Sequence, residues 1–346
     1  MELHKALLKA AAFTAKGKDA PTLYQSIQLL PAESEEQPAR VYATDGLLGC
    51  LINVDIDLPL VLLPVEACKP VARQRVLLVE LDGPEVRFRL APGGLYKMAA
   101  KEPVGWPGVP SVPRAMEPLT HWRWIRKVLH VASDPKGGKT NYPYLRFRPG
   151  CAEATDGFRV SVAEVPAWPH DRVVPARLFK GWAGHPRPLA YFDAERAWFR
   201  VGSELRWAPI RVDVQFPDCH KLLATDYHGP TLSVDAKKLL GAVRRATAVS
   251  TLKTVALDFS GQEVVIKSWS AAEGGKAFRA VLVGQAGEPE AKAIKILSGK
   301  LLAQALALVE TPNVRLCYRD VANEPLRIES GMWAESLWPW KVAESG

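Results

Sequence analysis

The chain has 346 residues, of which 48% are hydrophobic and 24% are charged, which excludes a disordered or membrane-spanning class of protein. This length predicts two or three domains. The 45 Lys and Arg residues outnumber the 37 Asp and Glu residues, and the formal net charge of +8 favours a polyanionic partner.

Taken in chain order, the patterns predict alternating helices and strands. Basic amphipathic helices are expected where apolar residues recur at every third or fourth position, over residues 3–15, 121–132 and 236–248. Strands are expected over residues 22–30, 85–90, 143–149, 196–202, 254–259 and 264–269. Short helical stretches are expected over residues 65–74 and 176–184. These elements predict an α+β fold with helices packed on antiparallel sheets.

Landmarks recur along the chain at nearly constant spacing, which is typical of duplicated domains. The tetrapeptide Ala-Thr-Asp-Gly occurs at 43–46 and again at 154–157, and Pro64 and Pro175 follow the two copies at equal distance. Aromatic-Pro pairs begin at Trp106, Phe216 and Trp338. Turn-rich segments mark two boundaries. The sequence therefore predicts three homologous domains, covering residues 1–117, 118–227 and 228–346.

The five cysteines are isolated from one another, at Cys50, Cys68, Cys151, Cys219 and Cys317. They form no Cys-x-x-Cys or Cys/His cluster, so we expect no metal, no cofactor and no disulfide framework. Isolated cysteines suit a reducing compartment. The N-terminal apolar stretch carries charges, and no apolar run approaches about 18 residues. We therefore expect a cytoplasmic protein without a membrane partner.

The three-part chain resembles the bacterial DNA sliding clamp, the β subunit of DNA polymerase III. The residues that carry the resemblance are Pro21-Thr22-Leu23, both Ala-Thr-Asp-Gly copies, Phe216-Pro217-Asp218 and residues 337–342. The resemblance implies a head-to-tail homodimeric ring with helices lining its channel and sheets forming its outer wall. It implies a non-enzymatic processivity factor of DNA replication, which encircles double-stranded DNA and tethers DNA polymerase and clamp-loader subunits through short linear motifs.

A channel lined by Lys and Arg attracts DNA without reading its bases, because phosphate contacts carry no sequence information. Under the resemblance, the basic residues of the first and second helix of each domain are the channel candidates, although an ordinary solvated face is the alternative for each. The loop 133–142 is expected to add two phosphate contacts. The DNA-binding candidates are Lys5, Lys9, Lys69, Arg73, Arg123, Arg126, Lys127, Lys136, Lys139, Arg177, Lys180, Lys237, Lys238, Arg244, Arg245 and Lys300.

The same loop contains Gly-Gly-Lys-Thr at 137–140, which is similar to the end of a P-loop. The first glycine of that motif would fall at Ser133, and a strand rather than a helix is expected to follow. We therefore expect no nucleotide site.

The resemblance also implies an apolar pocket for partner peptides between the second and third domains. Phe158 stands where the family often has His, and Trp338 and Trp340 replace smaller residues, so an altered motif preference is expected. The alternative for both tryptophans is a place in the core of the third domain. The pocket candidates are Thr155, Gly157, Phe158, Arg159, Val160, Pro217, Lys221, Leu222, Leu337, Trp338, Pro339, Trp340 and Lys341.

A ring contact is implied between the first domain of one protomer and the third domain of its partner. Trp106 is the expected aromatic anchor, and it would face Ala248 and Val249. Lys97 and Lys101 are expected to lie opposite Glu288 and Glu290, where each surface pair contributes about 0–1 kcal/mol. The alternative for Trp106 is burial within its own domain.

Two other classes of protein remain open. An enzyme is disfavoured because the chain holds no HExxH, nucleophile-elbow or Rossmann fingerprint, and Asp45 and Asp156 stand at equivalent Asp-Gly turns, which suits a structural role. The other class is a clamp-fold paralogue that binds clamp partners or DNA without ring-type sliding. Its motivation is the net positive charge, because family members are commonly acidic outside the channel.

Overall fold

The computed structural model describes residues 1–16, 20–34, 37–132, 143–165, 171–182, 184–185, 187–211, 214–219, 223, 229–270, 277–287, 292–319 and 324–338. The chain divides into two compact units. One unit is Met1–Trp122 with Leu178–Arg211, and the other is Arg123–Arg177 with Val212–Gly346. Each unit thus takes one part of the middle third of the sequence. The division into three domains stays a prediction.

The first unit is built on an eight-stranded antiparallel sheet in the order β4-β1-β2-β3-β15-β14-β13-β8. Its central junction pairs β3 with β15, which lie far apart in the sequence; Ile52 lies opposite Glu204 there, and Gly49 opposite Trp207. The strands are β1 (Ser26–Leu30), β2 (Arg40–Thr44), β3 (Gly49–Asn53), β4 (Val61–Pro64), β8 (Glu117–Pro118), β13 (Leu189–Phe192), β14 (Arg196–Val201) and β15 (Glu204–Pro209).

Helix α1 (Leu3–Ala10) packs on β2 and β3 of this sheet. It buries residues 3, 6, 7 and 10, the spacing that places side chains on one face of a helix. A second, three-stranded sheet contains β5 (Val76–Asp82), β6 (Glu85–Leu90) and β7 (Gly94–Ala99). The strand predicted over residues 85–90 is confirmed.

Three predicted elements begin directly after prolines, and one of them differs from its prediction. The strand predicted over 22–30 is wrong at its start, where the chain forms the 3-10 turn η2 (Thr22–Gln25), in which the Tyr24 amide donates to the Pro21 carbonyl at 3.0 Å. The helical stretches predicted after Pro64 and Pro175 are single turns: α2 (Val65–Cys68), η3 (Val71–Arg73) and η4 (Ala176–Phe179). Pro70 follows α2 and has no amide hydrogen with which to continue the helix.

The second unit contains a nine-stranded antiparallel sheet in the order β12-β9-β10-β11-β24-β23-β22-β16-β20. Its junction pairs β11 with β24, and Arg159 lies opposite Leu337. The strands are β9 (Tyr144–Arg148), β10 (Gly150–Thr155), β11 (Arg159–Val165), β12 (Arg172–Pro175), β16 (Thr231–Asp235), β20 (Gln285–Gly287), β22 (Asn313–Cys317), β23 (Leu326–Ser330) and β24 (Trp333–Leu337).

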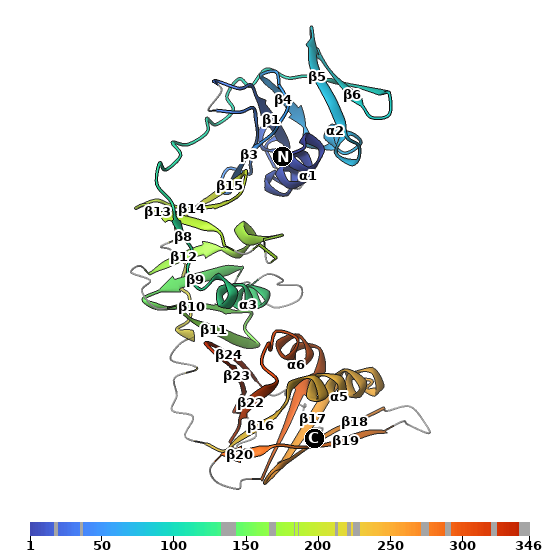
Figure 1. The fold of residues 1–346 in the computed structure, drawn as a ribbon, viewed down its shortest axis with the longest axis vertical. Coiled ribbons are helices and arrows are strands. Elements are labelled where there is room, and N and C mark those ends of the chain that lie inside the picture. The colour runs from blue at the N-terminus through green and yellow to red at the C-terminus, as the bar shows by residue number, and fades with distance from the viewer. Residues whose placement is uncertain are drawn as a thin grey trace. The chain divides into compact units, whose positions relative to one another are not determined.

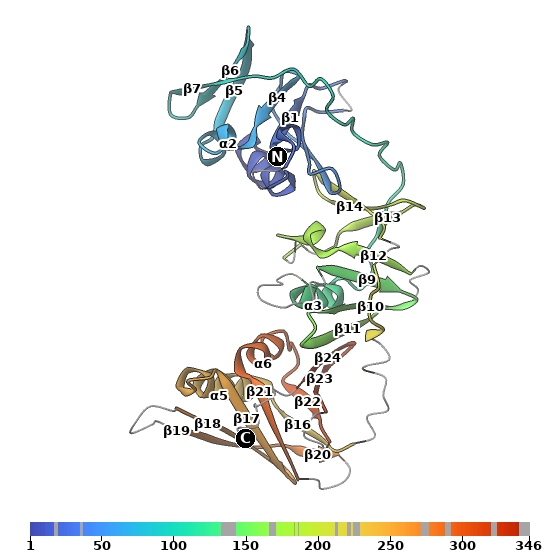
Figure 2. The ribbon, with the colours of Figure 1, turned by 180° about the vertical axis from the view of Figure 1, so that it is seen from behind.

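The second unit also holds a four-stranded sheet, β19-β18-β17-β21. Helices α5 (Ala236–Val249) and α6 (Gly299–Leu306) contact each other and this sheet, and they lie side by side in both views (Figures 1 and 2). Helix α3 (Trp122–Ala132) begins at the boundary of the two units. The predictions of α3 and α5 are confirmed. The four strands are β17 (Thr254–Ser260), β18 (Glu263–Trp269), β19 (Ala277–Val283) and β21 (Lys292–Ser298).

The two Ala-Thr-Asp-Gly copies form the same turn. Asp45 Oδ1 accepts hydrogen bonds from the amides two and three residues later, at 3.0 and 2.7 Å, and Asp156 Oδ1 accepts the same two at 3.0 and 3.1 Å. Gly46 and Gly157 have φ angles of 91° and 86°, a region that favours glycine. The expected structural role of both aspartates is therefore confirmed.

No helix within the described ranges is long and apolar enough to span a membrane.

Candidate functional site

Helix α5 presents an exposed basic face. Its N-terminus is capped by Asp235, whose Oδ1 accepts a hydrogen bond from the Lys238 amide at 2.8 Å, and one apolar face, which includes Leu239 and Val243, is buried. The exposed basic residues are Lys237, Lys238, Arg244 and Arg245. None of them forms an ion pair with a carboxylate in the described part of the chain. This face is therefore free to meet an anionic partner.

A hollow of about 650 Å³ lies between α5 and α6. Its lining is mostly apolar, with Ala248, Ala303 and Ala307 among the residues, and Arg244, Lys253 and Lys300 supply positive charge. The two helices come together where α6 begins with Gly299. A side chain at that position would lie less than 3.0 Å from Thr247. The hollow therefore concentrates three cations within one concave surface.

On helix α1, the predicted DNA contacts are paired inside the protein. Lys5 Nζ lies 2.5 Å from Glu2, and Lys9 Nζ lies 2.7 Å from the buried carboxylate of Glu204. Lys69, which follows α2, pairs with Glu66. These cations are partly neutralised, because each already has a carboxylate partner.

On helix α3, three basic residues converge on Glu310. Its carboxylate lies 2.5 Å from Nε of Arg123, 3.2 Å from Arg126 and 3.7 Å from Nζ of Lys127. Partial burial opposes ionisation of Glu310, but the hydrogen bonds and charges of the three bases prevail and lower its pKa. The sequence pattern did not indicate Glu310, because a single acidic residue in a loop carries no periodic signal.

Lys127 differs from the other bases because its side chain is only 2% exposed. Its ammonium lies 4.5 Å from the ring centre of Trp124 and 5.6 Å from that of Trp333. Burial lowers the pKa of Lys127, and Glu310 only partly offsets this. A phosphate contact by Lys127 therefore finds no support in the structure.

The other DNA-binding candidates have different exposures. Arg73, Lys180 and Lys300 are exposed, and Arg177 is half-buried. Lys136 and Lys139 lie outside the described residues. The exposed candidates without an ion pair are thus concentrated on α5 and α6.

The junction of β11 with β24 brings several of the predicted pocket residues together. Arg159 lies opposite Leu337, and the Trp338 amide donates to the Phe158 carbonyl at 3.3 Å. Trp338 and Phe216 are half-buried and pack against a cluster that includes Val160. Phe158 itself is 56% exposed. An apolar surface thus forms at this end of the junction, beside Pro217.

The polar members of the predicted pocket stabilise the turn. The Thr155 hydroxyl donates to the Arg159 carbonyl at 2.8 Å, and Arg159 forms ion pairs with Asp156 at 2.9 Å and with Glu335 at 3.5 Å. Because Arg159 is only 6% exposed, its charge is used within the protein. Gly157 supplies the left-handed conformation at the tip of the turn. Lys221, Leu222, Pro339, Trp340 and Lys341 lie outside the described residues.

The predicted ring contact is only partly described. Trp106 is 8% exposed and packs against Tyr24 and Tyr42, with ring centres 6.3 and 5.8 Å away, as in the alternative of burial within its own part of the chain. Ala248 is exposed and Val249 half-buried at the end of α5. The remaining four residues divide into two groups. Lys97 and Lys101 are exposed, with Lys97 4.0 Å from Glu85, whereas Glu288 and Glu290 lie outside the described residues.

Among the described residues, no three His, Cys, Asp or Glu side chains are grouped so that they could hold a metal ion. All five cysteines are buried and free. Burial raises the pKa of each thiol, to about 12 at Cys68, Cys151 and Cys317. Such thiols are poor nucleophiles.

The comparisons by sequence found no match, whereas the comparison of structures did. No family model matches the chain. No curated protein matches it either. Solved structures do match over nearly its whole length. The DNA polymerase III β subunit of Thermotoga maritima aligns with a TM-score of 0.78 at 14% identity, over 99% of this chain and 98% of that one.

Two further structures agree. The DNA polymerase sliding clamp of Bacillus subtilis aligns with a TM-score of 0.80 at 14% identity, over 98% of this chain and 97% of that one. The sliding clamp of Pseudomonas aeruginosa, solved with griselimycin bound, aligns with a TM-score of 0.77 at 15% identity, over 99% and 97%. The chain therefore has the fold of the DNA polymerase III β subunit sliding clamps.

Proposed function

We propose that this protein is a DNA sliding clamp, a homodimeric ring that encircles duplex DNA and tethers a polymerase to it. The observation that carries the proposal is the exposed basic face of α5, which forms no ion pair with any described carboxylate, in a chain whose fold matches sliding clamps over 98–99% of its length. A ring of this kind needs sequence-independent attraction, and phosphate contacts supply it.

Helices α5 and α6 are the proposed principal DNA contacts. Their exposed cations have no carboxylate partner in the described part of the chain. No ion pair within the described residues therefore has to break when these cations bind phosphate. The paired bases Lys5, Lys9, Arg123 and Arg126 are proposed to contribute less, because each must first give up a carboxylate. Lys127 is left out of the proposed set because it is buried.

The partner pocket is proposed at the apolar end of the β11–β24 junction. Phe158 and Trp338 offer aromatic surface next to the buried cluster that contains Val160, which suits one or two apolar side chains of a linear motif. Polymerase and clamp-loader subunits are the proposed owners of such motifs. The protein is proposed to act in the cytoplasm, and to do so without catalysis.

The ring contact is proposed to use Ala248 and Val249 at the end of α5, with Lys97 and Lys101 facing Glu288 and Glu290 of the partner subunit. Trp106 is proposed to support this contact from within the core rather than to touch the partner, because its side chain is buried. A head-to-tail contact gives a closed ring only if its rotation closes.

The test is retention on DNA of different topology. The protein is loaded onto nicked circular plasmid by a clamp loader with ATP, and half of the sample is then linearised. A clamp stays on the circle and runs off the linear form, and its solution mass is that of a dimer. Equal retention on both forms would favour the clamp-fold paralogue, and a monomeric mass at micromolar concentration would contradict the ring.

A further inference from the structure

Two hollows occupy equivalent places in the repeated architecture. The first hollow, about 680 Å³, lies in the first unit where β3 meets β15, and the second, about 420 Å³, lies in the second unit where β11 meets β24. On one wall, residues related by the spacing of the two Ala-Thr-Asp-Gly copies line both: Pro38 and Pro149, Arg40 and Cys151, Leu51 and Val162, Asn53 and Glu164.

The opposite wall shows a correspondence of the same kind, with a constant spacing of its own. Here Arg200 matches Glu329, Gly202 matches Gly331, Ser203 matches Met332 and Leu205 matches Ala334. The strand registers agree with this, because Glu204 lies opposite Ile52 and Trp333 lies opposite Ala163. The two hollows are therefore equivalent sites in the two units. A comparison of their lining residues shows how they differ in charge.

The charges of the two hollows differ. In the second hollow Arg327 lies 2.7 Å from Glu329 and Arg148 lies 2.7 Å from Asp218, so its cations are neutralised. In the first hollow Arg200 replaces the equivalent glutamate, and it forms no ion pair with any carboxylate among the described residues. Arg200 is therefore the one lining cation of the first hollow for which the described chain supplies no counter-charge, since Arg40 is paired with Glu33.

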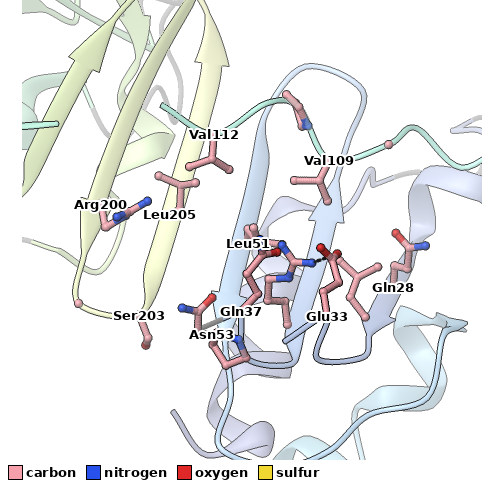
Figure 3. A pocket seen from close by; sticks show the side chains of 16 residues that line it. Gln28, Glu33, Gln37, Leu51, Asn53, Val109, Val112, Arg200, Ser203 and Leu205 are labelled. Carbon is pink, nitrogen blue, oxygen red and sulfur yellow. Dashed lines mark hydrogen bonds and ion pairs between the residues drawn. The ribbon is translucent and has the colours of Figure 1, made fainter. Parts of the chain in front are cut away.

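The floor of the first hollow is apolar, and polar side chains, among them Gln28, Glu33 and Gln37, line the rest of it. Leu51 and Leu205 are each 5% exposed and form its floor, and Val109 and Val112 come from the segment that crosses above them (Figure 3). At its edge, the side-chain amide of Asn53 forms no hydrogen bond within the described part of the chain. The hollow thus combines an apolar floor with one guanidinium and one amide for which the described residues supply no partner.

We propose that the first hollow binds a short extended peptide segment in which an acidic residue neighbours an apolar one. The apolar side chain packs among Leu51, Leu205 and Val112, and the carboxylate pairs with Arg200. Asn53 is placed to bond the peptide backbone. The volume lies within the range of sites that take small ligands. A nucleic acid fits less well, because it needs several cations at phosphate spacing rather than one.

This site shares no residue with the proposed partner pocket at the β11–β24 junction, and it does not depend on a ring or on DNA. It therefore adds a second docking position, for a partner segment of acidic and apolar composition. Because Glu329 of the second hollow is paired with Arg327, whereas Arg200 has no carboxylate partner among the described residues, only the first hollow offers an uncompensated charge to a ligand.

The probe is a fluorescein-labelled octapeptide of alternating leucine and aspartate, titrated against the full-length protein at low salt by fluorescence anisotropy. We expect binding that weakens roughly tenfold in Arg200→Glu and also when asparagine replaces aspartate in the peptide. The matched control is Arg89→Glu, which reverses a 62% exposed base on β6 of the same unit and should leave binding unchanged. Circular dichroism verifies that both variants are folded.

Four outcomes would overturn the proposal. The first is that the wild-type protein fails to bind the probe at concentrations up to about 1 mM. The second is that Arg200→Glu binds the probe as tightly as Arg89→Glu does. The third is that binding is lost in Phe158→Ala but kept in Arg200→Glu, which would place the probe in the partner pocket. The fourth is that a single-stranded oligonucleotide displaces the probe from the wild-type protein but does not bind Arg200→Glu. That result would assign the hollow to nucleic acid.

Discussion

Gly49 and Trp207 lie opposite each other where β3 pairs with β15, and the indole occupies the space that a side chain at residue 49 would need. A β-carbon there would lie less than 3.0 Å from the ring. Trp207 in turn packs against Tyr42 and Trp198, with ring centres 5.7 and 5.4 Å away. The absence of a side chain at one position thus allows an aromatic cluster to fill the junction.

Gly49→Ala should destabilise the protein by about 1–3 kcal/mol, because the added methyl group overpacks a junction that is already filled. Urea unfolding followed by tryptophan fluorescence measures the change. Gly184→Ala is the control, since a side chain at that glycine would meet no atom of the described residues within 4 Å, and the variant's stability should change by less than about 0.5 kcal/mol. Equal effects in the two variants would contradict the close packing at residue 49.

The basic face of α5 should dominate DNA binding. Replacing Lys238 and Arg245 by Ala should reduce the slope of log affinity against log salt by about 1.8, since each phosphate contact contributes about 0.9. The matched control is Lys5→Ala with Lys69→Ala, which removes two bases that are already paired with glutamates and should change the slope by much less. A larger change of slope in the control pair would indicate that the DNA contact lies in the first unit.

Lys127→Met should leave stability unchanged or raise it by up to about 2 kcal/mol, because a buried cation is replaced by an apolar side chain of similar length. The folded pKa of Lys127 is lowered by burial, so the folded state releases this proton before the unfolded state does. The wild-type protein should therefore gain stability relative to the variant as pH rises through the folded pKa toward about 10.4, the ordinary lysine value.

The stability of Glu310→Gln should be measured together with that of Lys127→Met. It removes the partner of Lys127 and leaves the ammonium buried, so it should destabilise the protein by about 1–3 kcal/mol. If Lys127→Met proves more harmful than Glu310→Gln in chemical unfolding at pH 7, the ammonium is better stabilised by Trp124 and Trp333 than its lowered pKa indicates.

Phe158→Ala should weaken the binding of a polymerase-derived clamp-binding peptide roughly tenfold while leaving stability nearly unchanged, because the ring is 56% exposed. Leu47 is the matched control. It stands at the same place in the first Asp-Gly turn, directly after the glycine, and it is 59% exposed. Isothermal titration should show full affinity for Leu47→Ala, whereas a loss of affinity in both variants would indicate that the peptide does not choose between the two turns.

The sequence by itself determined the local elements of this protein. The helices α1, α3 and α5 follow from apolar residues at every third or fourth position, and β6 follows from strict alternation over Glu85–Leu90. Both Asp-Gly turns were also predictable, because their hydrogen bonds join residues within four positions of each other. The resemblance to sliding clamps, read from these landmarks, agrees with the fold.

Only the tertiary structure decided which charges are free. Lys127 and Lys237 look alike as bases on amphipathic helices, yet the first is buried beside Glu310 and the second is exposed. The pairing of β3 with β15, and of β15 with β14, similarly decided that Arg200 stands beside an apolar floor with no carboxylate partner among the described residues. Ion pairs and burial depend on residues far apart in the chain, and periodicity carries information only about near neighbours.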